Sequence, residues 1–419
     1  MSHNALRMAA FYTVATLGLV PMAQADEDPI VIGTMATLEG AFASAGEDGM
    51  RGFRMALEEF DGEIAGREIK VISESTDTSP ESAVNAAQKL VNVDGADLLL
   101  GPLSGSEGIA VRDYSRDVDG VTFINGASAA QETTLRDPSD NFFRFSTDGA
   151  QWMAGLGTYV VDERDWKRVA TVAEDYSFPY AQVAGFLYEF CQAGGEVAER
   201  FWTPIGTSDY SSVVFSIPDD VDAIFVALTG SDAVDFLQQY RDAGGDKPII
   251  GGTNTVDGTV LSAEGGQRDH IVGTPSGAPV PGEWDNEQWK NWVDRYHEMF
   301  GDDALSEPSI FAHAYYTNTL AMLTALEDVG GELGDHSEYR EVLANLEIET
   351  PTGAVSLDEN RAAIADMFLR EVRVDDDGNL YNANVGVAEG VNQTLGMDRD
   401  EFLALEAPSR DHPRCAEIR

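Results

Sequence analysis

Two glycine- and serine-rich turns carry the groups that could bind a small ligand. Ser104, Gly105 and Ser106 lie in GPLSGSEG, and Ala127 and Ser128 lie in INGASAA, each after an apolar run typical of a strand. Such turns offer hydroxyls and backbone N–H groups near the start of a helix, where the helix dipole favours an anion. The two turns therefore predict a binding site for a carboxylate. The alternative for Ser104 and Ser106 is ordinary helix capping.

The sequence lacks the residue constellations typical of an enzyme. Catalysis would require a nucleophile with a base, a metal cluster, or a pair of carboxylates with shifted pKa values in a cleft. The six histidines are scattered without metal-ligand spacing, and neither a Gly-x-Ser-x-Gly nor a P-loop motif occurs. The first strand–helix turn also lacks the glycine motif of a dinucleotide site. We therefore expect a binding protein that uses no metal and no cofactor.

Strand-like and helical segments alternate along the chain and must position these turns. Residues 30–108 read as strand, helix, strand, helix, strand, and the second half repeats this order. This alternation predicts an α/β fold with mostly parallel sheets, whose ligands bind at the carboxyl ends of the strands. We also expect a strand over 121–128, a helix over 151–161 and a hairpin turn at 375–379. Three prolines and two glycines make 275–284 the best candidate for a linker.

Length and charge limit the possible functions. At 419 residues the chain is too long for one ordinary core, so two α/β domains are expected. With 27 basic and 73 acidic residues, the net charge is −46, which would repel nucleic acids and anionic lipids. Nucleic-acid partners are therefore excluded. Because the acidic residues are spread over helix faces and turns, we interpret them as an adaptation of the surface to high salt, that is, a halophilic protein.

The N-terminus has the pattern of a secretory signal peptide. An apolar run spans Met8–Val20, and Ala23 and Ala25 fit the small-residue rule for cleavage before Asp26. The run is shorter than the roughly 20 residues that span a bilayer. We expect residues 1–25 to be removed and the mature protein to be soluble in the periplasm.

Two cysteines, Cys191 and Cys415, remain in this exported chain. An oxidising compartment would permit a disulfide between them. The sequence alone leaves open whether the two thiols approach each other.

The sequence resembles type I periplasmic binding proteins, specifically the family that includes the leucine/isoleucine/valine receptors of ATP-driven importers. The resemblance lies in the order and spacing of several motifs: LEGAFASAGEDGMRGFRMALEEFD, GREIKVISESTDTSPESAVNAAQKLV, GADLLLGPLSGSEG, DYSFP, FVALTGSDAVDFLQQYRDAGG, KPIIGGT and TPTGAVSLDENRAAIADMFLREV. Each motif alone is weak, but together they cover nearly the whole mature chain.

The resemblance implies two lobes, each a mostly parallel sheet flanked by helices, joined by three hinge crossovers and closing on a solute. Lobe 1 would hold residues 26–146 and 277–352, and lobe 2 would hold 147–276 and 353–419. It also implies a monomer that delivers its solute to the membrane permease subunits of an ABC importer.

The resemblance also assigns ligand-binding residues. The turns with Ser104–Ser106 and with Ala127 and Ser128 match the positions that hold the carboxylate of the solute. Gly105 stands where the family has a ligating serine, so a backbone N–H or Ser106 must replace that hydroxyl. Tyr176 and Phe178 match paired aromatic positions that cover an apolar solute, and Phe42 would form the opposite wall.

One departure from the family leaves the solute open. Thr253, in IIGGTNT, stands where amino-acid receptors place a glutamate that pairs with the ammonium group. Either Glu39 or Asp232 supplies the missing charge, or the solute has no ammonium group. A branched-chain amino acid is the first expectation. The alternatives are an aromatic acid, an amide or urea as solute, or a sensory ligand-binding protein with the same fold.

The interpretation of the charge predicts that stability depends on salt. Removing salt strengthens repulsion among the acidic residues, so the melting temperature should fall as the salt concentration is lowered. Differential scanning calorimetry across a salt series tests this. A melting temperature that does not change with salt would contradict the halophilic interpretation.

Overall fold

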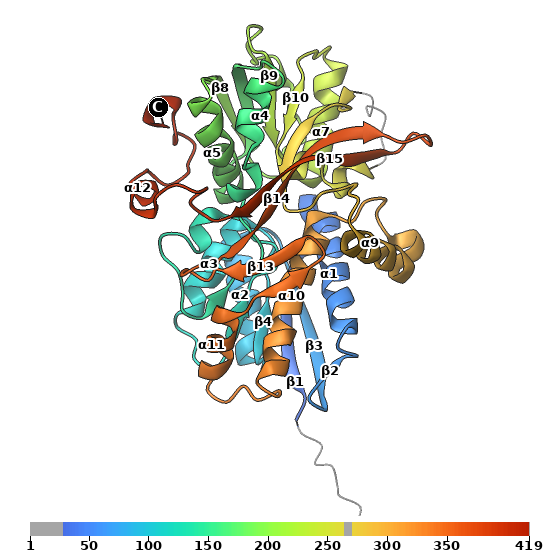
Figure 1. Cartoon of the computed structure of the whole chain (residues 1–419), viewed down its shortest axis with the longest axis vertical. Helices are drawn as coiled ribbons and strands as arrows, with labels where there is room; N and C mark the ends of the chain where they lie inside the picture. The colour runs from blue at the N-terminus through green and yellow to red at the C-terminus, as the bar shows by residue number, and fades with distance from the viewer. Residues whose placement is uncertain (1–27, 264–269, 419) are drawn as a thin grey trace, which may run out of the picture.

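The structure consists of two α/β units, one above the other in Figure 1. It is a computed structural model that describes residues 28–263 and 270–418. The expected signal peptide lies outside the described residues. Each unit is a sheet of mostly parallel strands flanked by helices, so the expected α/β class is confirmed.

The sheet of the first unit has the order β2-β3-β1-β4-β5-β6. All neighbouring strands are parallel except β2 and β3, which form a short hairpin. Its strands are β1 Ile30–Thr37, β2 Glu63–Ile64, β3 Arg67–Thr76, β4 Leu98–Leu100, β5 Thr122–Ile124 and β6 Phe142–Phe143. The central strands are almost entirely buried, as expected for a parallel sheet covered on both faces.

Helices α1 and α10 pack together beside this sheet, and α2 packs on α3. At Gly52 in α1 a methyl group would come within 1.8 Å of the Ala312 carbonyl oxygen, so the glycine permits the close approach of α1 to α10. The helical segments of this unit are η1 Gly40–Phe42, α1 Ala43–Glu58, α2 Pro80–Asn92, α3 Gly105–Ser115, η2 Gln131–Thr133, α9 Glu287–Phe300, η6 Gly301–Asp303, α10 Ile310–Asp328 and α11 Ser337–Asn345.

The second sheet has the order β12-β13-β14-β11-β10-β9-β7-β8, with β15 paired to β14. Strands β7 to β11 are parallel, and β12 to β15 are antiparallel. Its strands are β7 Arg168–Glu174, β8 Glu196–Thr203, β9 Ala223–Ala227, β10 Ile249–Gly251, β11 Pro275–Ala278, β12 Ile348–Thr350, β13 Gly353–Leu357, β14 Ala363–Val374 and β15 Leu380–Val391. The expected hairpin turn at 375–379 joins β14 to β15.

The remaining helical segments accompany the second sheet and the C-terminal tail. They are η3 Gln151–Met153, α4 Leu156–Asp162, α5 Ser177–Gln192, α6 Ser211–Val214, α7 Gly230–Asp242, η4 Thr253–Val256, α8 Gly258–Leu261, α12 Arg399–Leu403 and α13 Cys415–Ile418. A disulfide joins Cys191, near the end of α5, to Cys415, whose Cα atom is 5.1 Å away.

Three expected elements differ from the structure. The strand expected over 121–128 ends at Ile124, because the Asn125 side chain donates to the Ser128 carbonyl and closes a turn. The helix expected over 151–161 is divided, because Gly155 takes a left-handed conformation with φ 84° between η3 and α4. The linker expected over 275–284 begins as strand β11, since its first four residues are buried in the second sheet.

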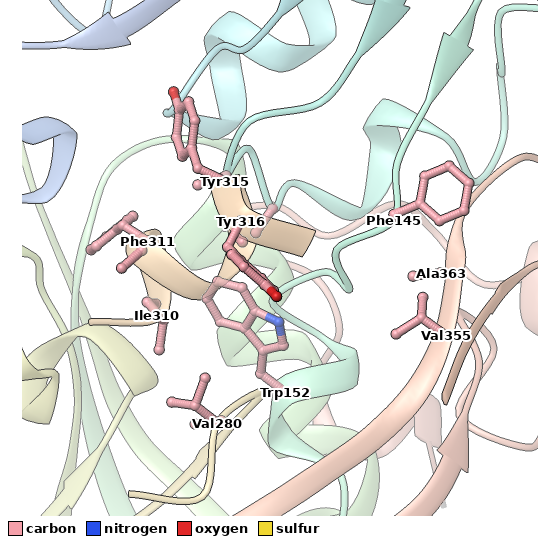
Figure 2. Close-up of a cluster of buried hydrophobic side chains, with 14 of the residues drawn as sticks. Phe145, Trp152, Val280, Ile310, Phe311, Tyr315, Tyr316, Val355 and Ala363 are labelled. Carbon is pink, nitrogen blue, oxygen red and sulfur yellow. The ribbon is translucent and has the colours of Figure 1, made fainter. Parts of the chain in front are cut away.

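The described chain passes between the two units in three segments (Figure 1). The first follows β6, the second follows β11, and the third follows β13, which belongs to the second sheet but lies beside the first unit. Arg144 and Ala362 form a parallel bridge, so the first and third of these segments lie side by side. Trp152, Val280, Ile310 and Phe311 belong to one buried cluster that draws on both units, and Figure 2 shows these side chains near one another. The hydrophobic core therefore continues through the junction.

A buried ion pair also lies at this junction. Arg144 and Asp148 are both fully buried, with Nη2 of Arg144 3.3 Å from Oδ2 of Asp148. The Asp148 carboxylate also accepts hydrogen bonds from the Gln151 backbone and from the Gln393 side chain. The pair thus connects the first crossing segment to the chain that follows β15.

We expect Asp148→Ala to lower the free energy of unfolding by about 3–5 kcal/mol, because it leaves the Arg144 guanidinium buried without its counter-charge. Urea unfolding measures the loss. Asp285→Ala is the matched control, since Asp285 forms an ion pair with Lys290 but is 98% exposed, and should change stability little. Equal stabilities of the two variants would contradict a structural role for the buried pair.

Candidate functional site

A small cavity lies where the carboxyl ends of the strands of the two units meet. Its volume is only about 10 Å³, room for about one water molecule, because side chains of both units nearly fill it. The first unit lines it with Phe42, Leu103, Ser104, Gly105, Ala127 and Ala129, together with Phe311 of α10. Tyr176, Phe178, Thr229 and Asn254 of the second unit and Trp152 of the first crossing segment complete the wall. Most of its lining residues are apolar, and its polar groups come from the start of α3, from Tyr176 and from Thr229 and Asn254.

The start of α3 forms one polar end. The Ser104 hydroxyl accepts from the Glu107 amide and the Glu107 carboxylate accepts from the Ser104 amide, so the two residues form a capping box. Ser104 therefore caps the helix, as the alternative interpretation held. The amides of Gly105 and Ser106 have no hydrogen-bond partner among the described residues. Burial raises the pKa of Glu107, while the hydrogen bonds that its carboxylate accepts from Ser104 and Thr78 act in the opposite direction.

Aromatic rings from both units form the cover of the cavity. Phe42, in η1, and Tyr176, at the start of α5, have ring centroids 6.2 Å apart across the gap between the units. Phe178 lies 6.1 Å from Tyr176 and meets the Trp152 ring edge-on at 5.3 Å. These rings can surround an apolar group of a solute and exclude water.

The second polar end consists of Thr229 and Asn254. The Glu174 carboxylate accepts hydrogen bonds from the Thr229 amide at 2.9 Å and from its hydroxyl at 3.2 Å. Asn254 Nδ2 donates to the Thr229 hydroxyl at 3.0 Å, while the buried Oδ1 of Asn254 has no partner among the described residues. Burial raises the pKa of Glu174 well above its usual range, and it does the same for the neighbouring Tyr176 hydroxyl. This end therefore offers an acceptor to a hydrogen-bond donor.

Six of the residues singled out from the sequence line the cavity together. They are Phe42, Ser104, Gly105, Ala127, Tyr176 and Phe178. The Ala127 amide donates to the Pro102 carbonyl at 3.0 Å, so it is not available to a ligand.

The other residues singled out lie outside the cavity lining. The Ser106 hydroxyl lies 3.1 Å from that of Ser177, so it joins the starts of α3 and α5. Ser128 packs against Gly108 of α3. The Thr253 hydroxyl donates to the Gly277 carbonyl.

Neither acidic candidate for the missing charge reaches the cavity lining. Asp232 is buried in the first turn of α7 and accepts from the Gly206 amide at 2.7 Å. Glu39 is exposed before η1.

Several lining residues were not found by sequence reasoning. Asn254 directly follows Thr253, and Thr229 directly precedes α7, so both lie in loops that the sequence had marked. Trp152 and Phe311 carry no local signal, because only the packing of the crossing segment against α10 brings them to the cavity.

Two further findings concern the described residues. No group of three or more His, Cys, Asp or Glu side chains in residues 28–263 and 270–418 has an arrangement that could hold a metal ion. In the same part of the chain, no helix combines the length and the apolar character that crossing a membrane requires.

The sequence was compared with models of protein families and with known proteins, and the matches agree on one family. A family model described as periplasmic binding protein matches residues 29–379. The chain is 24% identical over 389 residues to the Leu/Ile/Val-binding protein homolog 6 of Brucella melitensis, which covers 92% of this chain and 97% of that protein. It is 30% identical over 246 residues to the Leu/Ile/Val-binding protein BraC3 of Rhizobium johnstonii, which covers 57% and 64% of the two chains.

Solved structures share the fold. An ABC transporter substrate-binding protein from Sphaerobacter thermophilus has a TM-score of 0.78 and 28% identity, covering 87% of this chain and 99% of its own. A solute binding protein of an ABC transporter from Rhodopseudomonas palustris BisB5, solved with 3,4-dihydroxybenzoic acid, has a TM-score of 0.79 and 23% identity, covering 88% and 99%. A leucine binding protein from Thermotoga maritima has a TM-score of 0.73 and 20% identity, covering 86% and 99%.

The environment of Asp232 predicts a pH effect on stability. Burial raises the pKa of Asp232 from 3.8 to about 6. Because the folded protein holds this proton more tightly than the unfolded chain, the free energy of unfolding should decrease as pH rises from about 4 to 6. Asp232→Asn removes this effect, so its free energy of unfolding relative to the wild type should rise by about 2 kcal/mol between pH 4 and pH 7.

Urea unfolding of both proteins at several pH values measures the difference. Asp246→Asn is the control, because Asp246 is exposed. If the difference in the free energy of unfolding between wild type and Asp232→Asn stays constant with pH, the pKa of Asp232 is not raised by folding and the prediction is wrong.

Proposed function

This chain belongs to the periplasmic binding protein family and is a solute-binding protein of an ABC transporter rather than an enzyme, and we propose that it captures a small amphipathic carboxylate by closure of two lobes. Lobe 1 comprises residues 26–146 and 277–352, and lobe 2 comprises 147–276 and 353–419. After removal of the signal peptide the protein is a periplasmic monomer, and its closed form delivers the solute to the membrane permease subunits.

The observation that carries the proposal is the unpartnered start of α3. Gly105 lines the cavity at the positive end of α3, a favourable position for a carboxylate, and the amides of Gly105 and the next residue, Ser106, have no partner among the described residues. No basic side chain lines the cavity, so the backbone supplies the positive potential. The aromatic cover fits an apolar body of the solute, and the cavity of about 10 Å³ must widen by parting of the lobes before it holds one.

The second polar end distinguishes the candidate solutes. Asn254 Oδ1 accepts a hydrogen bond from a donor of the solute, and Glu174 orients Thr229 behind it. In an α-amino acid the ammonium group is bonded to the same carbon as the carboxylate, so we place it at Asn254 beside the carboxylate, with the apolar branched side chain under the aromatic rings. Branched-chain amino acids are therefore the first candidates.

A second candidate is an aromatic acid. Rings at Phe42, Trp152, Tyr176, Phe178 and Phe311 surround the cavity, and no carboxylate lies in its lining. A phenolic hydroxyl would donate to Asn254 Oδ1 in place of the ammonium group. An amide or urea would offer the α3 amides a neutral carbonyl oxygen, which is a weaker acceptor than a carboxylate at the positive end of a helix. A sensory partner in place of the permease would use the same ligand site.

Closure brings the two lobes into contact beside the cavity. A methyl group on Gly105 would lie only 2.9 Å from Cβ of Phe178, and one on Gly230 would lie 2.2 Å from the Ala41 carbonyl oxygen. Only glycine permits these distances, so the closed form requires both residues. Such closure is favoured by a solute that touches both lobes at once.

A thermal-shift screen in high salt tests the proposal. L-leucine, L-isoleucine, L-valine, benzoate, 4-hydroxybenzoate and urea are the probes, because a ligand that binds only the folded state raises the melting temperature. We expect a carboxylate among them to stabilise the protein, and L-leucinamide, which lacks the carboxylate, not to do so. Stabilisation by urea alone, or by leucinamide as well as leucine, would contradict the carboxylate site.

We expect Gly105→Ala and Tyr176→Ala to weaken binding of the best carboxylate by at least about tenfold, a loss of about 1.4 kcal/mol. Gly105→Ala hinders closure, and Tyr176→Ala removes the cover. Tyr176→Phe keeps the ring and is the matched control, with affinity close to wild type. Isothermal titration calorimetry measures the affinities, and normal binding by both alanine variants would disprove this site.

A further inference from the structure

The C-terminal tail lies against the loop that carries Tyr176. We call residues 404–418 the C-terminal strap, which passes along the outside of α5 and β8 at the upper left of Figure 1. The disulfide between Cys191 and Cys415 fixes the strap to the end of α5. The strap is thus covalently held beside the second lobe, within reach of the start of the same helix.

One side chain of the strap binds the loop directly. Arg410 Nε donates to Asp175 Oδ1 at 2.7 Å, and Arg410 Nη2 binds Asp175 Oδ2, so the guanidinium holds both carboxylate oxygens. Asp175 directly precedes Tyr176, which covers the cavity. A bidentate arginine–carboxylate pair fixes orientation as well as distance. Arg410 therefore constrains the turn from which Tyr176 projects.

The backbone of Arg410 is itself held by β8. Trp202 Nε1 donates to the Arg410 carbonyl at 3.2 Å, and the Arg200 guanidinium donates to the same carbonyl at 3.5 Å. The Trp202 ring also meets the Tyr180 ring edge-on at 4.9 Å. The Tyr180 hydroxyl donates to Asp175, so β8, the strap and the first turn of α5 form a closed ring of contacts.

The turn formed by Asp175 and Tyr176 has no side chain that caps helix α5. Tyr176 is the N-cap residue of α5 and provides no side-chain hydrogen bond to the helix. The two backbone amides of this turn each donate a hydrogen bond. The Asp175 amide donates to the Thr203 carbonyl, and the Tyr176 amide donates to the Glu174 carbonyl. Since no capping side chain orients the start of α5, the contact from Arg410 adds to the Tyr180–Asp175 bond and holds the second carboxylate oxygen of Asp175.

Three arginines lie close together between β8 and the strap, although the chain is strongly acidic. Basic residues number 27 against 73 acidic ones, yet Arg200, Arg410 and Arg414 all line the groove between β8 and the strap. The Asp175 side chain is 15% exposed and the Arg410 side chain is 63% exposed, so the pair lies at the surface and its role depends on bidentate geometry rather than on burial.

We propose that Arg410 is a positioning residue that holds the Asp175–Tyr176 turn in the conformation that covers the solute, and that the Cys191–Cys415 disulfide keeps Arg410 within reach. This inference rests on the proposed function, because it assigns a regulatory role at the same site. When Arg410 is removed, the Asp175 carboxylate keeps only its hydrogen bond from Tyr180, while the Asp175 amide keeps its bond to Thr203. The turn that carries Tyr176 then becomes more mobile.

Hydrogen–deuterium exchange of the ligand-free full chain tests the inference without any solute. In Arg410→Ala, amides of the segment 175–180 should exchange about three- to tenfold faster, because the contact that orders the turn is lost. Arg414→Ala is the matched control, since Arg414 lies in the same groove but contacts Asp411 and not Asp175. Arg410→Lys retains the charge without the bidentate geometry and should give an intermediate rate.

The double variant Cys191→Ser, Cys415→Ser should show the same local acceleration if the disulfide keeps the strap in place. Unchanged exchange over 175–180 in Arg410→Ala would overturn the inference. Equal acceleration across the whole second lobe would also overturn it, because that result indicates general destabilisation rather than positioning.

A binding measurement forms the second arm of the test. With L-leucine as probe, Arg410→Ala should raise the dissociation rate about three- to tenfold while Arg414→Ala leaves it unchanged, measured by stopped-flow fluorescence. If L-leucine does not bind the wild type, the amino-acid assignment is wrong, and the exchange experiment still decides the role of Arg410. If exchange accelerates but dissociation of bound L-leucine does not change, the turn is ordered by Arg410 without controlling the solute, and the inference fails.

Discussion

The central constraint in this structure is that buried backbone N–H groups require partners. In the first turn of α3, which places Gly105 in the cavity lining, the amides of Gly105 and Ser106 have no partner among the described residues, although the capping box satisfies the amides of Ser104 and Glu107. In the function that we propose, a carboxylate supplies the missing acceptors. Because Gly105 also touches Phe178 of the opposite lobe, anion binding and lobe closure depend on the same few atoms.

The fold and half of the site could be predicted from the sequence because their signals are local. Alternating strands and helices predict the α/β class, and a glycine–serine turn after a buried strand predicts the start of α3. The aromatic residues of DYSFP also line the cavity, since their loop follows strand β7 directly. These predictions depend on periodicity and loop position, which the sequence shows.

The remaining site residues depend on tertiary packing. Thr253 turns away from the cavity because Gly277 and Gln182 bind its hydroxyl, so that the next residue, Asn254, faces the solute. Phe311 joins the cavity only when α10 packs beside the first crossing segment. The disulfide partners are separated by 224 residues, and no local pattern reports such a distance.

Two of the few basic residues in this acidic chain have distinct structural roles. Arg144 is buried where the crossing segments lie side by side, and Arg410 binds the turn that covers the cavity. The cavity itself contains no basic side chain, so the anion is attracted by helix geometry rather than by a charged residue. A strongly acidic chain can therefore still hold the carboxylate site that we propose, because a backbone site is short-ranged and enclosed.

The most direct test of this account is a crystal structure of the protein with the solute that stabilises it most. The account predicts electron density for a carboxylate within hydrogen-bonding distance of the Gly105 and Ser106 amides, with the apolar part of the solute beneath the Tyr176 ring. A solute whose carboxylate binds elsewhere, with these two amides left without an acceptor, would contradict it.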